Sequence, residues 1–148
     1  MIDYKIKTAC IEDVFIHLNW CKDDFIPNLA KTVDILSYSK KIVSNSITFE
    51  AWSDKKMVGL VAAYFNNESN KSEVYITNVS VLNENSGQGV ASKLLERCFK
   101  YANENQFEYI LLEVNRHNNK AIKLYERFDF DIIEYKENST ILMKKKIL

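Results

Sequence analysis

"NENSGQGVASKLLERCFKYANE", residues 83–104, carries two of the three glycines of the chain, Gly87 and Gly89, where a polar loop runs into an amphipathic helix. Glycine is favoured where the backbone needs a positive φ angle or where another group approaches the main chain closely. A helix start also leaves backbone N–H groups without partners at the positive end of the helix dipole, which attracts anions. The stretch therefore predicts a phosphate-binding loop.

Two common phosphate-binding motifs do not fit this loop. A P-loop ends in Gly-Lys-Ser or Gly-Lys-Thr, whereas Gly89 is followed by Val90 and Ala91. A dinucleotide fingerprint needs a third small residue three positions after the second glycine, where Ser92 is a poor match. A tight turn into a helix, with no ligand, and a nucleotide-phosphate site of another kind stay open as alternative interpretations of the two glycines.

Length and composition indicate one ordinary globular unit. The 148 residues are enough to bury a substantial core, and no repeat or linker divides them, so we expect a single domain over residues 1–148. The 20 basic and 20 acidic residues cancel, which leaves no overall positive charge to attract nucleic acid or an anionic membrane. Neither partner is expected.

The cysteines and histidines are too few and too scattered for a disulfide framework or a metal site. The three cysteines are Cys10, Cys21 and Cys98. They form no Cys-x-x-Cys pair, and His17 and His117 lie far apart in the sequence. Residues 1–10 alternate apolar and charged side chains, unlike a signal peptide, and no apolar run is long enough to span a membrane. We therefore expect a cytoplasmic protein without a metal.

Hydrophobic periodicity predicts the elements around the loop. In order, they are a strand at 2–7, helices at 11–24 and 29–43, strands at 46–53, 56–66 and 73–82 with a turn at 66–72, the helix from Val90, a strand at 107–114, a helix at 118–128 and two strands joined at 137–139. Asn78 and Ser80 lie inside the strand at 73–82, which indicates either a bulge or an edge strand with one wet face. The order predicts a mixed α/β fold with a central, mostly antiparallel sheet flanked by helices.

Two motifs resemble the GNAT superfamily of N-acetyltransferases. The acyl-CoA loop of that family reads Arg/Gln-x-x-Gly-x-Gly/Ala, and residues 86–91 here read Ser-Gly-Gln-Gly-Val-Ala. Its later helix commonly reads Asn-x-x-Ala-x-x-Leu-Tyr-Glu, a pattern that runs here from Asn118 to Glu126. The similar segment covers residues 79–130 and implies a GNAT-type single-domain fold.

The resemblance also implies acetyl-CoA as the acyl donor and direct attack on its thioester by a primary amine. The implied cofactor-binding residues are Val79, Val81, Gly87, Gln88, Gly89, Val90, Ala91, Ser92 and Asn118. Backbone groups of Val79 and Val81 would pair with the pantetheine arm as an added strand, and the loop amides would hold the pyrophosphate. Tyr125 would protonate the leaving thiolate. Glu73 is either a general base acting through water or a solvated strand-end carboxylate.

Several of these positions have a second interpretation or depart from the family pattern. Ser86 stands where the family usually has Arg or Gln, and Asp129 stands where it commonly has Gly, although Asp tolerates a left-handed φ. Asn118 also fits a helix N-cap, and Tyr125 also fits a core tyrosine. Candidates for the 3′-phosphate of CoA, or for plain solvated surface, are Gln88, Lys93, Arg97 and Lys120.

The acceptor amine is predicted to enter between the first two helices and the last two strands. Trp20 and Phe25 would form its walls, with Asp23 and Asp24 beside them and Tyr135 opposite, although both aromatic residues also fit simple helix packing. Aromatic walls beside carboxylates favour a small cationic amine. A protein or peptide amine and a non-catalytic acyl-CoA-binding domain remain alternatives, a homodimer stays open, and a covalent cysteine route is disfavoured.

Overall fold

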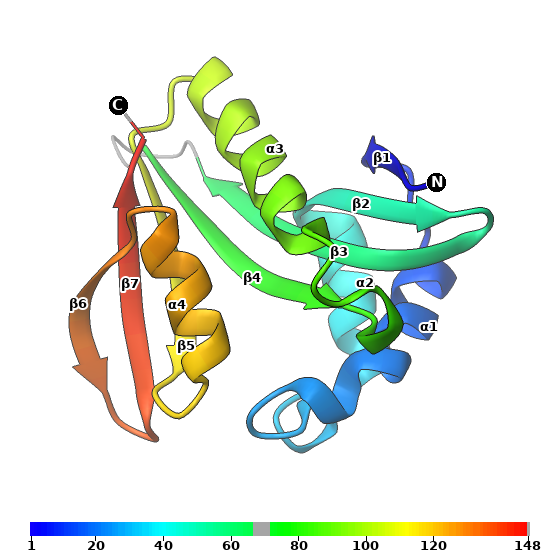
Figure 1. The fold of residues 1–148 in the computed structure, drawn as a ribbon, viewed down its shortest axis with the longest axis horizontal. Helices are drawn as coiled ribbons and strands as arrows, with labels where there is room; N and C mark the ends of the chain where they lie inside the picture. The colour runs from blue at the N-terminus through cyan, green and yellow to red at the C-terminus, as the bar shows by residue number, and fades with distance from the viewer. Residues whose placement is uncertain (67–71, 148) are drawn as a thin grey trace.

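The computed structural model describes residues 1–66 and 72–147, which form one seven-stranded sheet in the order β1-β2-β3-β4-β5-β7-β6 (Figure 1). The strands are β1 (Asp3–Ile6), β2 (Ile47–Ser53), β3 (Lys56–Asn66), β4 (Glu73–Val81), β5 (Tyr109–Asn115), β6 (Asp131–Lys136) and β7 (Thr140–Lys146). Every neighbouring pair is antiparallel except β4 and β5, which are parallel. The predicted mixed α/β fold with a mostly antiparallel sheet is confirmed. The turn predicted at 66–72 falls largely outside the described residues.

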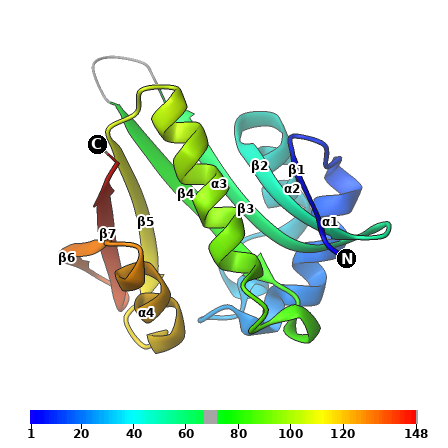
Figure 2. The same cartoon turned by 45° about the horizontal axis from the view of Figure 1, so that its top comes forward.

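Helices cover both faces of the sheet. The four α-helices are α1 (Ile11–Cys21), α2 (Ile35–Asn45), α3 (Val90–Glu104) and α4 (Asn119–Arg127). Helices α3 and α4 lie on one face, and α1 and α2 lie on the other (Figures 1 and 2). Each side has its own apolar cluster, so both faces of the central strands are buried.

The second helix starts later than its hydrophobic pattern predicts. Asp34 is its N-cap, with a carboxylate that accepts a hydrogen bond from the backbone N–H of Ser37 at 3.0 Å. Upstream, Leu29–Lys31 forms only one 3-10 turn. The predicted helix over 29–43 is therefore wrong in its first six residues, because the capping carboxylate of Asp34 fixes the start of α2 at Ile35.

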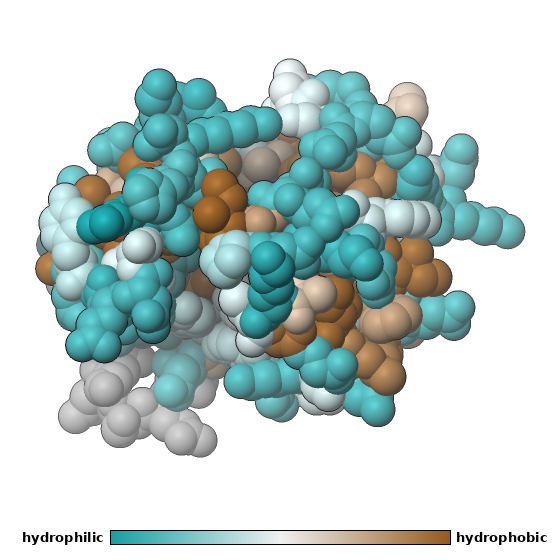
Figure 3. Space-filling view, turned by 90° about the horizontal axis from the view of Figure 1, so that it is seen from below, coloured by the Kyte–Doolittle hydropathy of each residue, from teal (hydrophilic) through white to brown (hydrophobic). Residues whose placement is uncertain are grey.

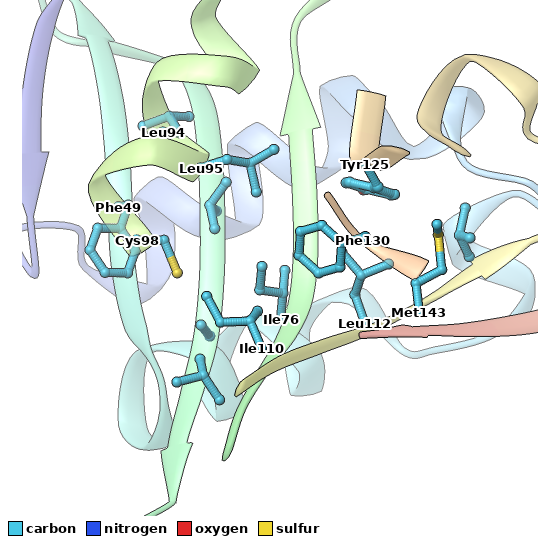
Figure 4. Close-up of a cluster of buried hydrophobic side chains, with 14 of the residues drawn as sticks. Phe49, Ile76, Leu94, Leu95, Cys98, Ile110, Leu112, Tyr125, Phe130 and Met143 are labelled. Carbon is cyan, nitrogen blue, oxygen red and sulfur yellow. The ribbon is translucent and has the colours of Figure 1, made fainter. Parts of the chain in front are cut away.

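Helix α3 packs its apolar stripe into the main core. Figure 4 shows Leu94, Leu95 and Cys98 of α3 facing Phe49 of β2 and Ile110 of β5, all of them fully buried. This contact depends on the third glycine of the chain. A Cβ atom on Gly59 of β3 would lie 2.8 Å from Val90 Cγ1 and 3.0 Å from Leu94 Cδ1. Glycine therefore lets the start of α3 lie directly against β3.

A buried carboxylate fixes where α1 leaves the sheet. Glu50 of β2 is fully buried and accepts hydrogen bonds from the backbone N–H groups of Thr8 at 2.9 Å and Ala9 at 3.1 Å. The hydroxyls of Thr8 and Thr48 and the indole N–H of Trp52 also donate to it. A buried charge is tolerated only when it is hydrogen-bonded in this way. The connection from β1 to α1 is thereby held against the sheet.

The central strand β4 carries a bulge and then leaves its neighbour. Ala62 of β3 faces Asn78 and Ala63 faces Ile76, so Thr77 is the extra residue. The pairing of β4 with β5 runs only from Glu73 to Ile76, and beyond it the two strands diverge (Figure 1). Because β4 is an interior strand, the bulge interpretation of its polar residues is confirmed and the edge-strand interpretation is wrong.

Replacing Gly59 by valine is expected to lower the free energy of unfolding by about 1–3 kcal/mol, the usual cost of overpacking a core. The added carbon atoms would collide with Val90 and Leu94. Urea unfolding followed by circular dichroism measures the change. Glu134→Val, on the exposed strand β6, is the control and should change stability by about 0.5 kcal/mol or less. A Gly59→Val protein as stable as wild type would contradict the close packing of β3 and α3.

Candidate active site

The divergence of β4 from β5 leaves backbone groups of β4 without a strand partner. The backbone N–H of Leu82 donates to the carbonyl oxygen of Val58 in β3 at 2.9 Å. Alternate residues of an antiparallel strand direct their backbone groups to the same side, so Ser80 also faces β3. Val79 and Val81 then direct their N–H and C=O groups toward β5, which no longer pairs there. The exposed edge can accept an extended, amide-containing chain as an added strand.

A cleft of about 250 Å³ opens where the two strands separate. Its walls come from the end of α1 and the turn after it, from β4 beyond the paired region, from the end of β5 and from α4. Figure 3 views the molecule from below, toward the ends of β4 and β5 that diverge in Figure 1, and shows apolar side chains at the surface between hydrophilic ones. The cleft joins residues from four elements that are distant in sequence.

A second hollow, of about 510 Å³, continues from the cleft to the start of α3. Gly87 and Gly89 line it with φ angles of 79° and 78°, and Gly89 is the N-cap of α3. These left-handed angles explain both glycines, and a Cβ at either position would meet no atom within 4 Å, so the space above the loop is open. The unpaired N–H groups of α3 therefore face a hollow that suits a phosphate.

Most of the cofactor-binding residues expected from the sequence meet around these two spaces. The hollow is lined by Val79, Val81, Gly87, Gly89, Val90, Ala91, Ser92 and Asn118. Gln88 is not among its lining residues, and its side-chain amide points back to the carbonyl oxygen of Glu84 at 3.5 Å. Gln88 can therefore contribute through its backbone only.

Positive charge reaches the loop from α4. The ammonium group of Lys120 donates a hydrogen bond to Ser86 Oγ at 3.0 Å, and Arg127 lines the same hollow. Lys120 thus supplies a cation beside the position where the family usually has Arg or Gln. Lys93 and Arg97 instead lie over the ring of Tyr4, 5.7 Å and 5.1 Å from its centroid.

Tyr125 lies on α4 between the cleft and the hollow and lines both. Its ring packs against Phe130 with centroids 5.8 Å apart (Figure 4). No hydrogen bond joins its hydroxyl to another of the residues that the structure describes. Burial raises the pKa of Tyr125 far above its usual value. The phenol therefore keeps its proton and can donate a hydrogen bond into the cleft.

The two ends of α4 explain the residues that flank Tyr125. Asn118 is the N-cap: its side-chain oxygen Oδ1 accepts a hydrogen bond from the backbone N–H of Ala121 at 3.2 Å, while the residue also lines the cleft. Asp129 adopts φ of 67° after the helix, as expected for a substitute for glycine. Asn118 can therefore cap the helix and contact a ligand at once.

Glu73 does not lie in the cleft. It opens β4 at the end where that strand pairs with β5, its partner in the register being Tyr109. Its carboxylate lies 3.7 Å from the ammonium group of Lys144. The cleft begins at Ile76, on the far side of this paired segment, so Glu73 is not among its lining residues.

The structure also separates the two aromatic residues expected at the acceptor site. Phe25 lines the cleft, whereas Trp20 is 51% exposed and lines a different surface hollow together with Trp52. The ammonium group of Lys56 lies 4.8 Å from the centroid of the Trp20 ring. The end of α1 turns Trp20 away from the cleft, so Phe25 alone remains as an acceptor wall.

The cysteines are unsuited to covalent catalysis. Burial raises the pKa of Cys21 and of Cys98 to about 12, so both stay protonated at neutral pH. Cys10 is exposed at the start of α1. Across residues 1–66 and 72–147, no three His, Cys, Asp or Glu side chains group as a metal site would require, and no helix there is long and apolar enough to cross a bilayer.

Comparison with known proteins identifies the family of the chain. The sequence profile of the Acetyltransferase (GNAT) family matches residues 12–130, which is most of the chain. The chain belongs to the GNAT acetyltransferase family. Among curated proteins, it is 30% identical over 88 residues to the probable N-acetyltransferase san of Drosophila melanogaster, a match that covers 59% of this chain and 48% of that protein. The chain thus matches about half the length of this relative.

Solved structures show the same fold. The ribosomal-protein-S18-alanine N-acetyltransferase of Escherichia coli superposes with a TM-score of 0.80 at 17% identity, over 99% of this chain and 94% of that one. The PaiA N-acetyltransferase of Thermoplasma acidophilum, solved in complex with coenzyme A, superposes with a TM-score of 0.73 at 16% identity, over 97% and 99% of the two chains. Both likenesses confirm the GNAT-type fold.

Gly89→Val is expected to weaken acetyl-CoA binding about 10-fold or more, which corresponds to about 1.4 kcal/mol. A branched side chain would occupy the open space above the loop and strain a residue with φ of 78°. Gln106→Val is the matched control, because Gln106 has φ of 65° just past the other end of α3 and is exposed. Calorimetric titration of both folded variants compares them. Equal acetyl-CoA affinity in Gly89→Val and wild type would refute the phosphate assignment.

Proposed function

We propose that this protein is an acetyl-CoA-dependent N-acetyltransferase that acetylates a primary amine by direct attack on the thioester. The single observation that carries the proposal is the continuity of three features. The diverging β4 edge, the glycine loop at the start of α3 and the residue Tyr125 all line one connected space. Together they offer an extended amide partner, an anion site and a proton donor.

The donor would lie across this space in one orientation. Its pyrophosphate would contact the amides from Gly87 to Ala91, close to Lys120, which gives the negative charge both backbone and side-chain partners. The pantetheine arm would extend along Val79 and Val81, with Asn118 opposite. The thioester would then reach the narrow cleft beside Tyr125. Nothing in this arrangement requires a metal.

Acetyl transfer in the cleft is a substitution at the thioester carbon. The amine nitrogen forms a bond to that carbon, the C–S bond then breaks, and the CoA thiolate departs. Because burial raises the pKa of Tyr125, its hydroxyl would stabilise the thiolate by donating a hydrogen bond rather than by full proton transfer. The thiolate would complete its protonation from water as CoA leaves.

A small-molecule amine is the favoured acceptor. The cleft of about 250 Å³ is narrow, with Phe25 in its wall and the exposed carboxylate of Asp24 at its side. An aromatic ring beside a carboxylate attracts a compact cation. A protein α-amine is the second candidate, because the structurally similar Escherichia coli enzyme is named for a ribosomal protein alanine.

Release of the CoA thiol across an amine panel tests the proposal. The panel compares amino sugars, polyamines and amino acids with peptides that have free N-termini or lysines. Turnover with small amines supports the favoured acceptor, and turnover with peptides alone supports the second. Tight acetyl-CoA binding without thiol release by any amine would instead identify a non-catalytic acyl-CoA-binding domain. Binding of ATP or NAD that added CoA does not displace would identify a nucleotide site unrelated to CoA.

Tyr125→Phe is expected to lower kcat about 10²-fold, as removal of one proton or hydrogen-bond donor to the transition state typically does. Acetyl-CoA affinity should stay unchanged, because the phosphate contacts lie elsewhere. Tyr101→Phe is the control, since Tyr101 packs against Phe65 with centroids 5.1 Å apart and lies outside the cleft lining. Steady-state kinetics measure both variants. Full turnover by Tyr125→Phe would return Tyr125 to a packing role.

A further inference from the structure

A buried chain of polar side chains ends in the wall of the cleft. His17 of α1 is fully buried, and its Nδ1 lies 2.9 Å from the carbonyl oxygen of Met57. Its Nε2 lies 2.9 Å from Oγ of Ser80, and Ser80 lines the cleft. Oγ of Ser80 in turn lies 2.7 Å from the side-chain amide of Asn78, which lines the cleft as well. The chain thus runs from the core to the reaction space.

The partners of His17 determine where its proton lies. A carbonyl oxygen only accepts hydrogen bonds, so Nδ1 must donate to Met57. Burial lowers the pKa of His17 to about 4, against two hydrogen bonds that raise it, so the ring is neutral at pH 7. Its Nε2 is then an acceptor, and the hydroxyl of Ser80 donates to it. The Sγ atom of Cys21, at 3.7 Å from the same nitrogen, is a more distant partner.

This direction also fixes the amide of Asn78. As placed, Oγ of Ser80 donates to Oδ1 of Asn78 at 2.7 Å. Because Nε2 of His17 needs the single hydroxyl proton of Ser80, the amide group must donate to Ser80 instead. The NH₂ group therefore faces Ser80, which a half-turn of the amide achieves. The amide atom of Asn78 that faces away from Ser80 has no hydrogen-bond partner among residues 1–66 and 72–147, although the side chain is only 2% exposed. The hydroxyl of Tyr38 already donates its proton to the carbonyl oxygen of Thr77 at 2.7 Å, so it cannot also donate to Asn78.

The carboxylates that reach the cleft are engaged elsewhere. Asp24 is exposed and accepts a hydrogen bond from the side-chain amide of Asn83 at 3.2 Å. Glu113 accepts one from the hydroxyl of Tyr75 at 3.2 Å and lies 3.7 Å from the ammonium group of Lys136. Neither faces a buried partner that could hold a proton. Ser80 is the cleft hydroxyl that is backed by a histidine.

We propose that Ser80, oriented by His17, accepts the proton of the attacking amine, so that these two residues form the base of the acetyl transfer. This inference rests on the proposed N-acetyltransferase function. Ser80 would touch the substrate nitrogen, and His17 would act through Ser80 as its positioning residue and proton store. The pair takes the role of general base, for which Glu73 was the candidate in the sequence.

The proton balance of this step starts from the neutral amine, after the bound ammonium has lost one proton to water. As the nitrogen forms its bond to the thioester carbon, it becomes far more acidic than a free ammonium, so a weakly basic imidazole suffices. The N–H proton passes to Oγ of Ser80 while the hydroxyl proton of Ser80 passes to Nε2 of His17. The C–S bond breaks and the thiolate takes a proton from water. After the amide leaves, His17 returns its proton through Ser80 to water.

Kinetics on the best amine from the panel test the inference. Ser80→Ala and His17→Gln should each lower kcat about 10²-fold with unchanged acetyl-CoA affinity, and the double variant should be no slower than either single one. Ser80→Thr keeps a hydroxyl and should recover most of the activity. Ser39→Ala is the matched control, because Ser39 is a buried hydroxyl on α2 that donates to the carbonyl oxygen of Ile35 at 2.7 Å.

Each outcome separates this inference from the function on which it rests. Undiminished kcat in a folded Ser80→Ala protein, or its loss in Asp24→Asn or Glu113→Gln instead, overturns the inference and leaves the acetyltransferase in place. A wild-type protein that acetylates no amine overturns both. Nitrogen-15 spectra of His17 give a readout without turnover: the neutral Nδ1–H tautomer at pH 7 is expected, and an Nε2–H tautomer or an imidazolium contradicts the proposed base.

Discussion

The loss of pairing between β4 and β5 after Ile76 is the constraint on which the rest of the site depends. The bulge at Thr77 bends β4 away, and the parallel ladder cannot continue past it. An interior sheet edge is thereby left open with backbone groups of Val79 and Val81 facing the gap. Proteins usually pair or cover such an edge. Here the opening is the surface at which we propose that acetyl-CoA binds.

Packing on both faces of the sheet holds this opening in place. On one face, Gly59 lets α3 lie against β3, which sets the glycine loop at the end of the open edge. On the other face, Glu50 fixes the start of α1, and α1 carries His17 to the back of β4. The side of the cleft proposed for acetyl-CoA and the side proposed for the amine are thus held by separate contacts. Strand β4 is the element that both sides share.

Local patterns in the sequence predicted the parts of the site that depend on short spacing. Gly87 and Gly89 have the positive φ angles that their loop requires, and Asn118 caps the helix whose resemblance to the GNAT motif singled out Tyr125. The start of α2 was missed because a short-range cap at Asp34 overrides a longer apolar pattern. The direction of the Trp20 side chain was also not predicted: near the end of α1 it points into a different surface hollow from the cleft.

Features that depend on strand pairing or long-range contact were outside the reach of the sequence alone. Glu73 looked suitable because it opens β4, but only the register with β5 shows that this end is closed. His17 and Ser80 lie 63 residues apart, so no spacing joins them. The one available signal was the pair of polar residues, Asn78 and Ser80, inside an otherwise apolar strand.

Amide hydrogen exchange of β4 with and without saturating acetyl-CoA tests most directly whether the open strand edge is the donor site. The account predicts that the amide protons of Val79 and Val81 are slowed strongly by acetyl-CoA, because the pantetheine arm would pair with their backbone groups. The amide of Ser80, which already faces β3, should change little. Tight acetyl-CoA binding that leaves Val79 and Val81 exchanging as in the free protein would contradict the account.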